Sequence, residues 1–109
     1  MDDLTFNARR ASASRRPAES GDVESRFRTL VQSPLRAGLL RYLNSRPDES
    51  FDLQSLMTTF GRLKLDVDNC LQNLVEFGVV QLVPGTPVRY AAHRPETDGV
   101  ADQLDLFLE

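Results

Sequence analysis

Four polar side chains lie close together in the segment 64–80, namely Asp68, Asn69, Gln72 and Glu76. Their spacing places them on one side of an α-helix, opposite an apolar side. The amides of Asn69 and Gln72 can each donate and accept hydrogen bonds, which suits the edges of nucleic-acid bases. The carboxylates of Asp68 and Glu76 oppose this use, because phosphates attract cations. The segment therefore combines side chains suited to base recognition with an unfavourable charge.

Cations near this segment can offset its carboxylates, and a third carboxylate, that of Asp66, has a structural explanation. Asp66 lies close to the start of the helix, where a carboxylate can cap free N–H groups and meets the positive end of the helix dipole. The candidate DNA-binding residues are Arg62, Lys64 and Arg89 for phosphate, and Asn69, Gln72 and Asn73 for base edges. A solvated surface of mixed charge is an equally good interpretation of the same residues.

The acidic C-terminal segment 96–109 contains a second candidate site. An extended peptide of this type can place two apolar side chains in a pocket while an amide makes directional hydrogen bonds. The candidate partner-binding residues are Gln103, Leu104, Asp105, Leu106 and Phe107. The apolar residues of the segment also fall at helical spacing, which predicts a C-terminal helix that caps the core or forms a dimer. An unstructured acidic end, or the start of a further element, is the third alternative.

Side chains for catalysis or metal binding do not occur at an interpretable spacing. An enzyme needs a nucleophile with its base, paired carboxylates in a pocket, or a metal cluster. His93 and Cys70 are single, which excludes an internal disulfide and gives no metal-ligand pattern. We therefore expect no enzymatic activity, no metal site and no cofactor.

The helix that carries the central polar residues is predicted by its apolar side. Val67, Leu71 and Leu74 follow the i, i+4, i+7 spacing of a buried helix face. Gly78 suits a left-handed C-terminal cap, and residues 79–83 then change to β-branched strand composition.

Two shorter helices precede it. Ser33 as N-cap and Pro34 at the first helical position predict a helix that ends near residue 44, behind a helical stretch that starts at Phe27. Asp52 as N-cap and Gly61 as terminator predict the next helix.

A β-hairpin is predicted after the third helix. The runs 79–83 and 88–92 are rich in strand formers. Pro84 and Gly85 between them suit the i+1 and i+2 positions of a type II turn. This predicts a hairpin with a tight tip.

The length of the chain predicts one small domain with a terminal segment on each side. The 109 residues carry a net charge of -3. We expect a disordered Arg/Ser/Ala-rich arm over 1–25, a domain over 26–95 and the acidic segment over 96–109. Neither a long apolar run nor a signal-peptide pattern occurs, so we expect a cytoplasmic protein that does not bind membranes.

The order of these elements resembles the winged helix-turn-helix domain of ArsR- and MarR-type bacterial transcriptional regulators over residues 33–92. The resemblance implies a mainly α fold with a small β-hairpin, and a dimer that binds DNA. In that family the early turns of the third helix usually carry Ser, Thr, Arg and His, and metal sensors place a cysteine pair ahead of the second helix. Glu49 and Phe51 stand in place of that pair, so no metal sensing is implied. The matching motifs are Ser33-Pro34-Leu35-Arg36 with Leu39-Leu40, Asp52-Leu53, Leu71-x-x-Leu74 and Gly78-Val79-Val80.

Two functions follow from these patterns. In the first, a dimer brings the third helix to the major groove of DNA while the wing and the arm touch the backbone. In the second, the same fold is a protein-interaction adaptor that uses the acidic third helix and the C-terminal peptide. The string Gln103-Leu104-Asp105-Leu106-Phe107 resembles the pentapeptide by which bacterial replication and repair proteins dock on the β sliding clamp, and all five positions fit the usual form.

Overall fold

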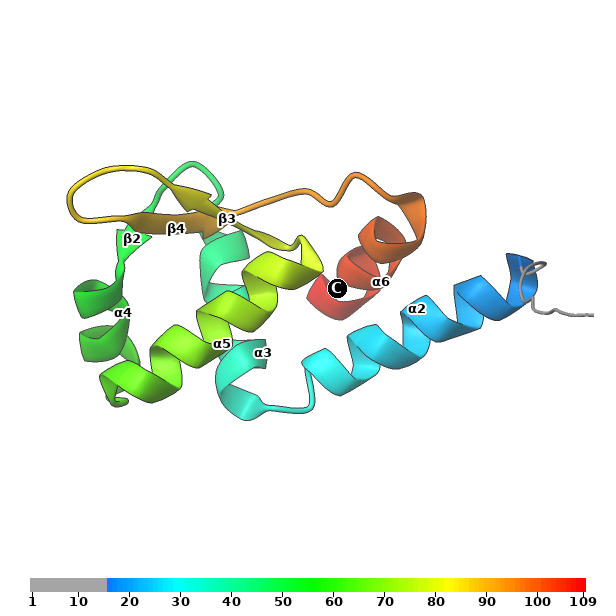
Figure 1. Cartoon of the computed structure of the whole chain (residues 1–109), viewed down its shortest axis with the longest axis horizontal. Helices are drawn as coiled ribbons and strands as arrows, with labels where there is room; N and C mark the ends of the chain where they lie inside the picture. Colours follow the sequence, from blue (N-terminus) through cyan, green and yellow to red (C-terminus); the bar gives the residue numbers. More distant parts are fainter. Residues whose placement is uncertain (1–15) are drawn as a thin grey trace, which may run out of the picture.

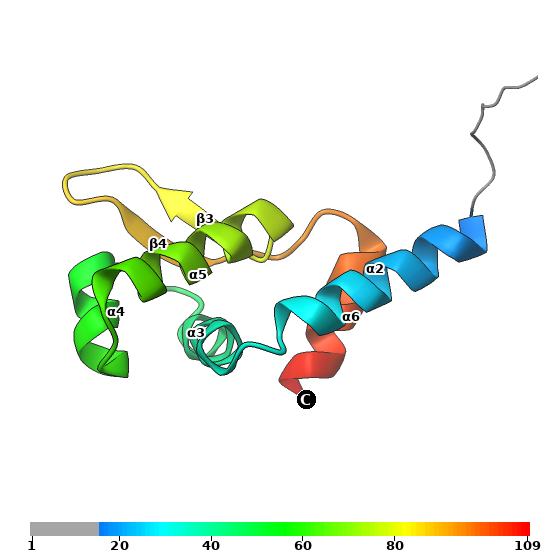
Figure 2. The ribbon, with the colours of Figure 1, turned by 60° about the horizontal axis from the view of Figure 1, so that its bottom comes forward.

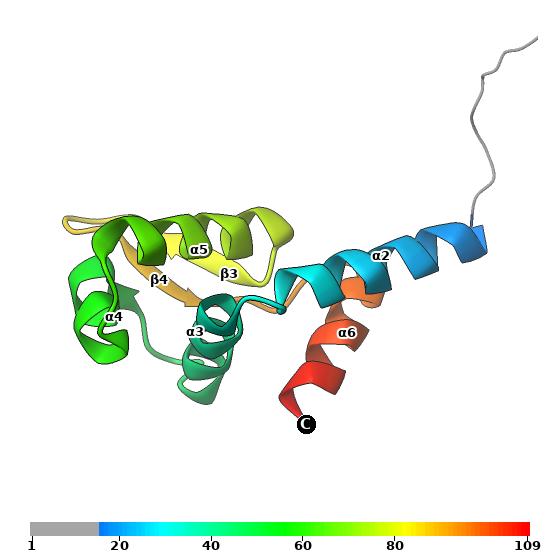
Figure 3. The ribbon, with the colours of Figure 1, turned by 90° about the horizontal axis from the view of Figure 1, so that it is seen from below.

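A computed structural model describes residues 16–109, which form helices around a small antiparallel sheet (Figure 1). The molecule is elongated, with extents of 56 × 28 × 23 Å, because its first helix extends away from the other elements (Figures 1 and 3). The elements in chain order are α2 (Arg16–Leu30), α3 (Pro34–Ser45), β2 (Phe51–Asp52), α4 (Leu53–Phe60), α5 (Lys64–Phe77), β3 (Val80–Val83), β4 (Arg89–Ala92) and α6 (Asp98–Leu108).

The core forms where α3, α4 and α5 pack against one another and against the sheet. Val67, Leu71 and Leu74 give α5 an inner side that is completely removed from water. Each fully buried leucine contributes about 1.5–3 kcal/mol to folding through the hydrophobic effect. The other side chains of the core without solvent exposure are Leu39, Leu40 and Leu43 from α3, Leu56 from α4, and Val79, which precedes the β3–β4 hairpin, or wing.

The predicted starts of α3 and α4 are confirmed. Ser33 is the N-cap of α3, its hydroxyl accepts a hydrogen bond from the Arg36 N–H at 3.2 Å, and proline follows it. Asp52 is the N-cap of α4 and accepts a hydrogen bond from the Ser55 N–H at 2.8 Å. This hydrogen bond lowers the pKa of the Asp52 carboxyl, because it stabilises the charged form.

The ends of α4 and α5 also follow the sequence prediction, but the capping role predicted for Asp66 does not. Gly61 and Gly78 have φ angles of 63° and 91°, the left-handed conformation that glycine adopts without strain. Asp66 does not cap α5 as predicted, since the N-cap residue is Leu63 and its side chain makes no capping hydrogen bond. Asp66 lies in the first helical turn, where the helix dipole still favours its charge.

The sheet has three strands in the order β2-β4-β3. The hairpin β3–β4 is confirmed, with Val80 opposite Ala92 and Val83 opposite Arg89. The prediction of a tight type II turn is wrong, because Gly85 has a φ of 155° instead of about 80° and residues 84–88 form a wider loop. Strand β2 was not predicted, since two residues are too few to show an alternating pattern.

Helices α2 and α6 pack on each other at the end of the domain opposite α4 (Figures 1 and 2). Helix α2 begins at Arg16, inside the segment 1–25 that the sequence predicted to be disordered. Long-range contacts hold the C-terminal half of α2, where Phe27 is buried and the Val23 side chain approaches Gly99 of α6. Residues 1–15 of the predicted arm lie outside the described residues.

We expect the free energy of unfolding to depend on the inner side of α5 and not on its outer side. Leu71→Ala removes a buried side chain and lowers this free energy by about 2–5 kcal/mol. Leu65→Ala, on the same helix but 69% exposed, changes it by less than about 0.5 kcal/mol. Urea denaturation followed by circular dichroism measures both values, and equal losses would contradict the assignment of the two sides.

Candidate functional site

The outer side of α5 carries the amides that the sequence singled out. Asn69 and Gln72 are both exposed, as the prediction requires. Leu65 precedes Asn69 by four residues and Glu76 follows Gln72 by four residues, so both lie on the same side of the helix as the amides. The residues available to a ligand along this side are therefore an apolar residue, two amides and a carboxylate.

Asp68 lies elsewhere than the sequence analysis placed it. Its side chain is half-buried, and it is close enough to Tyr90 of β4 to affect its titration. Burial of Tyr90 and the charge of Asp68 both raise the pKa of the tyrosine hydroxyl. Asp68 therefore lies on the wing-facing flank of α5, and the outer side is less acidic than the sequence suggested.

Two of the predicted phosphate-binding residues lie at the start of α5. Arg62 and Lys64 are exposed. Neither side chain makes a hydrogen bond or an ion pair with residues 22–109, the range over which side chains are described. Both cations are therefore free to bind an anionic ligand at this end of the helix.

Arg89, the third predicted phosphate-binding residue, is partly engaged within the sheet. Its guanidinium donates to the Ser50 carbonyl oxygen at 3.3 Å, and its charge contributes to the lowered pKa of Asp52. Arg89 is exposed, so the remaining N–H groups face solvent. A ligand phosphate could bind these N–H groups, but a contact that moved the guanidinium would break its hydrogen bond to Ser50.

Asn73 differs from the other two amides because it contacts α3. Its side-chain oxygen accepts a hydrogen bond from Arg36 at 3.2 Å. The same guanidinium donates to the carbonyl oxygens of Leu30 at 2.6 Å and Thr29 at 3.4 Å, at the end of α2. Arg36 therefore connects α2, α3 and α5, and Asn73 helps to hold α5 in place.

Two exposed leucines flank Lys64 and were not singled out from the sequence. Leu63 is 74% exposed and Leu65 is 69% exposed. A helical projection of the sequence would have found Leu65, since it lies outside the line of Val67 and Leu71. The start of α5 is therefore apolar as well as charged.

The C-terminal candidate residues form part of α6 and are helical, not extended. Leu104 is only 2% exposed, and Phe107 packs edge-on against Phe27 with ring centroids 5.9 Å apart. Gln103 is half-buried, whereas Leu106 is 61% exposed. The two apolar residues Leu104 and Phe107 thus contribute to the fold of this chain.

Two arginines attach α6 to the domain. Arg94 forms a bidentate ion pair with Asp105, with N–O distances of 2.7 and 3.1 Å. The Arg41 guanidinium lies 4.1 Å from the centre of the Phe107 ring, within cation–π range. The hydrogen bond from Arg94 and its charge lower the pKa of the Asp105 carboxyl.

Metal binding and membrane insertion find no support in the described part of the chain. Across residues 16–109, no three side chains of His, Cys, Asp or Glu come together as metal ligands. None of the helices in this range is long and apolar enough to cross a bilayer.

Comparison with known proteins supports the fold. The structure is similar to that of HlyU from Vibrio cholerae N16961, with a TM-score of 0.61 and 15% sequence identity. The similarity covers 85% of this chain and 92% of the other. No family model matches the sequence, and no curated protein matches it significantly. At this identity the similarity shows the fold alone, which is a winged helix-turn-helix.

The ion pair on α6 predicts a specific titration. In the wild type the Asp105 pKa is lowered, so the pair stabilises the fold above the ordinary carboxyl pKa and this contribution is lost as the pH falls through the lowered value. We expect Arg94→Gln to raise the pKa of Asp105 toward its ordinary value. Carboxyl chemical shifts followed by NMR against pH measure the change. Arg28→Gln is the control, because Arg28 pairs with Glu24 on α2, and it leaves the titration of Asp105 unchanged.

Proposed function

We propose that this chain is a DNA-binding protein of the transcription-regulator type, in which α5 enters the major groove. The observation that carries the proposal is the outer side of α5, where Asn69 and Gln72 are exposed and Arg62 and Lys64 precede them without internal partners among the described residues. A winged helix places this surface beside the hairpin, so that helix and wing approach a duplex together (Figure 1).

Asn69 and Gln72 are the residues proposed to contact bases. Both side chains can pair with adenine through one donor and one acceptor in the major groove. Asn73 takes a supporting role in this proposal, because Arg36 already occupies its oxygen. The half-buried position of Asp68 reduces the repulsion that two adjacent carboxylates on the outer side would cause.

The strength of binding is set mainly by Arg62 and Lys64. Most other arginines in the described range already contact groups of this chain, as Arg36, Arg41 and Arg94 show. Few counterions are then released on binding, so we propose modest affinity with a shallow dependence on salt. The arginine pairs Arg9-Arg10 and Arg15-Arg16 of the arm are further proposed contacts, and their side chains lie outside the described residues.

A homodimer is part of the proposal. Helix α2 extends beyond α6, and Figures 2 and 3 show its first turns without a neighbouring element. An isolated helix of this length is only marginally stable in water, so a partner surface would stabilise it. We propose a second copy of the chain as that partner, which would present two α5 helices to neighbouring half-sites.

The salt dependence of DNA binding tests the proposal. We expect the wild type to bind a fluorescent duplex with an affinity that falls as salt rises. The double variant Arg62→Gln, Lys64→Gln should reduce the slope of log affinity against log salt by about 1.8 for each bound protomer, since two phosphate contacts are lost. Fluorescence anisotropy at several salt concentrations measures the slope.

A matched control separates local from overall charge. Arg28→Gln with Arg46→Gln removes the same charge from α2 and from the end of α3, away from α5, and should leave the slope unchanged. The proposal fails if the wild type shows no salt-sensitive binding, or if both double variants lose the same amount.

Exposed leucines favour a second candidate function, docking of a protein partner. Leu63, Leu65 and Leu106 are each more than half exposed, so their side chains are available to an apolar pocket of a partner. The partner considered for Leu106 is a bacterial sliding clamp, reached through Gln103–Phe107. Because this segment is helical and Leu104 is buried, such docking requires α6 to detach and extend.

Two single substitutions distinguish the docking surfaces. If the C-terminal peptide docks, Leu106→Ala should weaken binding to a purified sliding clamp by at least about tenfold, whereas Leu65→Ala should not. Neither residue belongs to the core, so both variants keep the fold. Surface plasmon resonance measures the affinities, and absence of binding by the wild type would exclude this partner.

A further inference from the structure

An open groove lies between α2 and the C-terminal half of α5, on the flank of α5 that faces away from the wing. Its volume is about 490 Å³, which is within the usual range for small-molecule sites. The groove has apolar and charged residues together, a combination that favours a ligand with both properties. The side chains that matter for this argument are Arg26, Thr29, Arg36, Asn73, Glu76 and Phe77.

The positively charged side of the groove is fixed before any ligand arrives. Arg36 is held by the carbonyl oxygens of Leu30 and Thr29 and by the side chain of Asn73. Three of the five guanidinium N–H groups are enough for these bonds, so two remain for a ligand. A guanidinium held in this way binds a carboxylate with little loss of side-chain entropy.

The floor of the groove is apolar and already contacts a cation. The Arg26 guanidinium lies 5.6 Å from the centre of the Phe77 ring. Leu30 also lines the groove and is buried. No further group fits between the guanidinium and the ring at this distance, so an apolar group of a ligand can contact Phe77 only beside Arg26.

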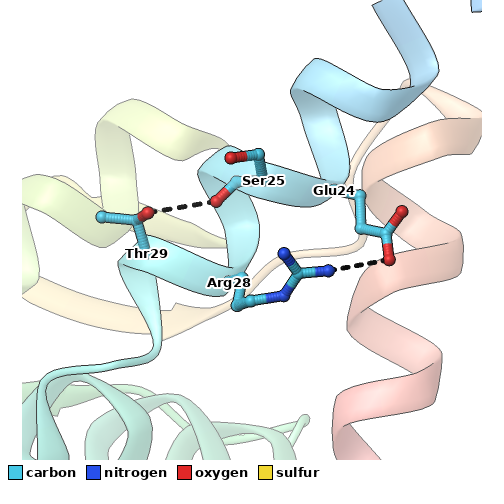
Figure 4. Close-up of polar contacts among 4 residues, drawn as sticks. All are labelled: Glu24, Ser25, Arg28 and Thr29. Carbon is cyan, nitrogen blue, oxygen red and sulfur yellow. Dashed lines mark hydrogen bonds and ion pairs between the residues drawn. The ribbon is translucent and has the colours of Figure 1, made fainter.

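The opposite charge is supplied by Glu76 of α5, which is exposed and lines the same groove. Ser25 and Thr29 add hydroxyl groups on the α2 side, where the Thr29 hydroxyl donates to the Ser25 carbonyl oxygen at 3.1 Å (Figure 4). Figure 4 also shows Glu24 and Arg28 turned in another direction on the same helix. The groove thus has two guanidinium groups and one carboxylate around an apolar floor. The Arg26 guanidinium also forms an ion pair with Asp22 at 3.2 Å, which uses one of its five N–H groups and leaves the others for a ligand.

We infer that this groove binds a small zwitterion with an apolar group, of the class of apolar α-amino acids. The carboxylate of the ligand pairs with Arg26 and Arg36, its ammonium group pairs with Glu76, and its side chain lies on Phe77. A simple anion would be repelled by Glu76, and a simple cation by the two arginines. The inference goes beyond DNA binding and does not depend on it.

L-phenylalanine is the probe, and ¹⁵N-labelled full-length protein is titrated with it by NMR without DNA. We expect shifts confined to amides around Thr29, Asn73 and Phe77, with a dissociation constant of about 1–10 mM because the groove is open and the ligand is small. The analogues 3-phenylpropanoate, which lacks the ammonium group, and phenethylamine, which lacks the carboxylate, should each bind at least about fivefold more weakly.

Substitutions assign the two charges of the ligand. Glu76→Gln should weaken L-phenylalanine binding about fivefold and leave 3-phenylpropanoate binding unchanged or stronger. Arg26→Gln should weaken both ligands. Glu24→Gln and Arg28→Gln make the same charge changes on another side of α2 and should weaken neither.

Three results would overturn the inference. The first is the absence of localised shifts at about 20 mM L-phenylalanine, well above the expected dissociation constant. The second is binding of either analogue as strong as that of L-phenylalanine. The third is a loss of affinity in Glu24→Gln equal to that in Glu76→Gln. None of these results depends on whether the protein binds DNA, so the two proposals succeed or fail separately.

Discussion

Burial of one side of α5 is the constraint on which the rest of the domain depends. Val67, Leu71 and Leu74 fill the space between α3, α4 and the sheet, and no part of these side chains remains in water. Since a helix turns by about 100° per residue, fixing this inner line also fixes the direction of every other α5 side chain. The packing of this inner side therefore decides which α5 residues face solvent, which face the wing and which line the groove beside α2.

Internal pairing of arginines determines the electrostatic character of the surface. Guanidinium groups on α2, α3 and the segment before α6 contact carboxylates, carbonyl oxygens or aromatic rings of the same chain. Bidentate and stacked contacts of this kind suit arginine, whereas the one lysine at the start of α5 has no such contact with the described residues. Among the described residues, three of these arginines, Arg26, Arg28 and Arg94, are paired with carboxylates, so their charge is partly offset within the chain.

Local patterns in the sequence predict most of the winged helix. They fail where contacts with residues far away in the chain determine the extent of a helix or the environment of a side chain. Ser33 with Pro34, Asp52, and Gly78 mark helix ends through backbone chemistry that does not depend on the remainder of the fold. The part of α2 ahead of Phe27 is not predictable in this way, because the side chain that packs there, Val23, contacts α6, which lies about 70 residues later in the chain. Asp68 was misplaced for a related reason: a polar residue on the edge of a helix can face either solvent or a neighbouring strand, and only the position of β4 decides.

The network of Arg36 limits which sequences can keep this architecture. Its guanidinium donates to two carbonyl oxygens at the end of α2, those of Leu30 and Thr29, and to one amide oxygen on α5. The Thr29 oxygen also accepts from the Gln32 N–H, at 3.2 Å. A lysine would carry the same charge, but its single nitrogen cannot reach acceptors on two helices in the geometry of a planar fork. Among homologues of this protein, position 36 should therefore vary together with position 73, and arginine should be retained wherever the amide is retained.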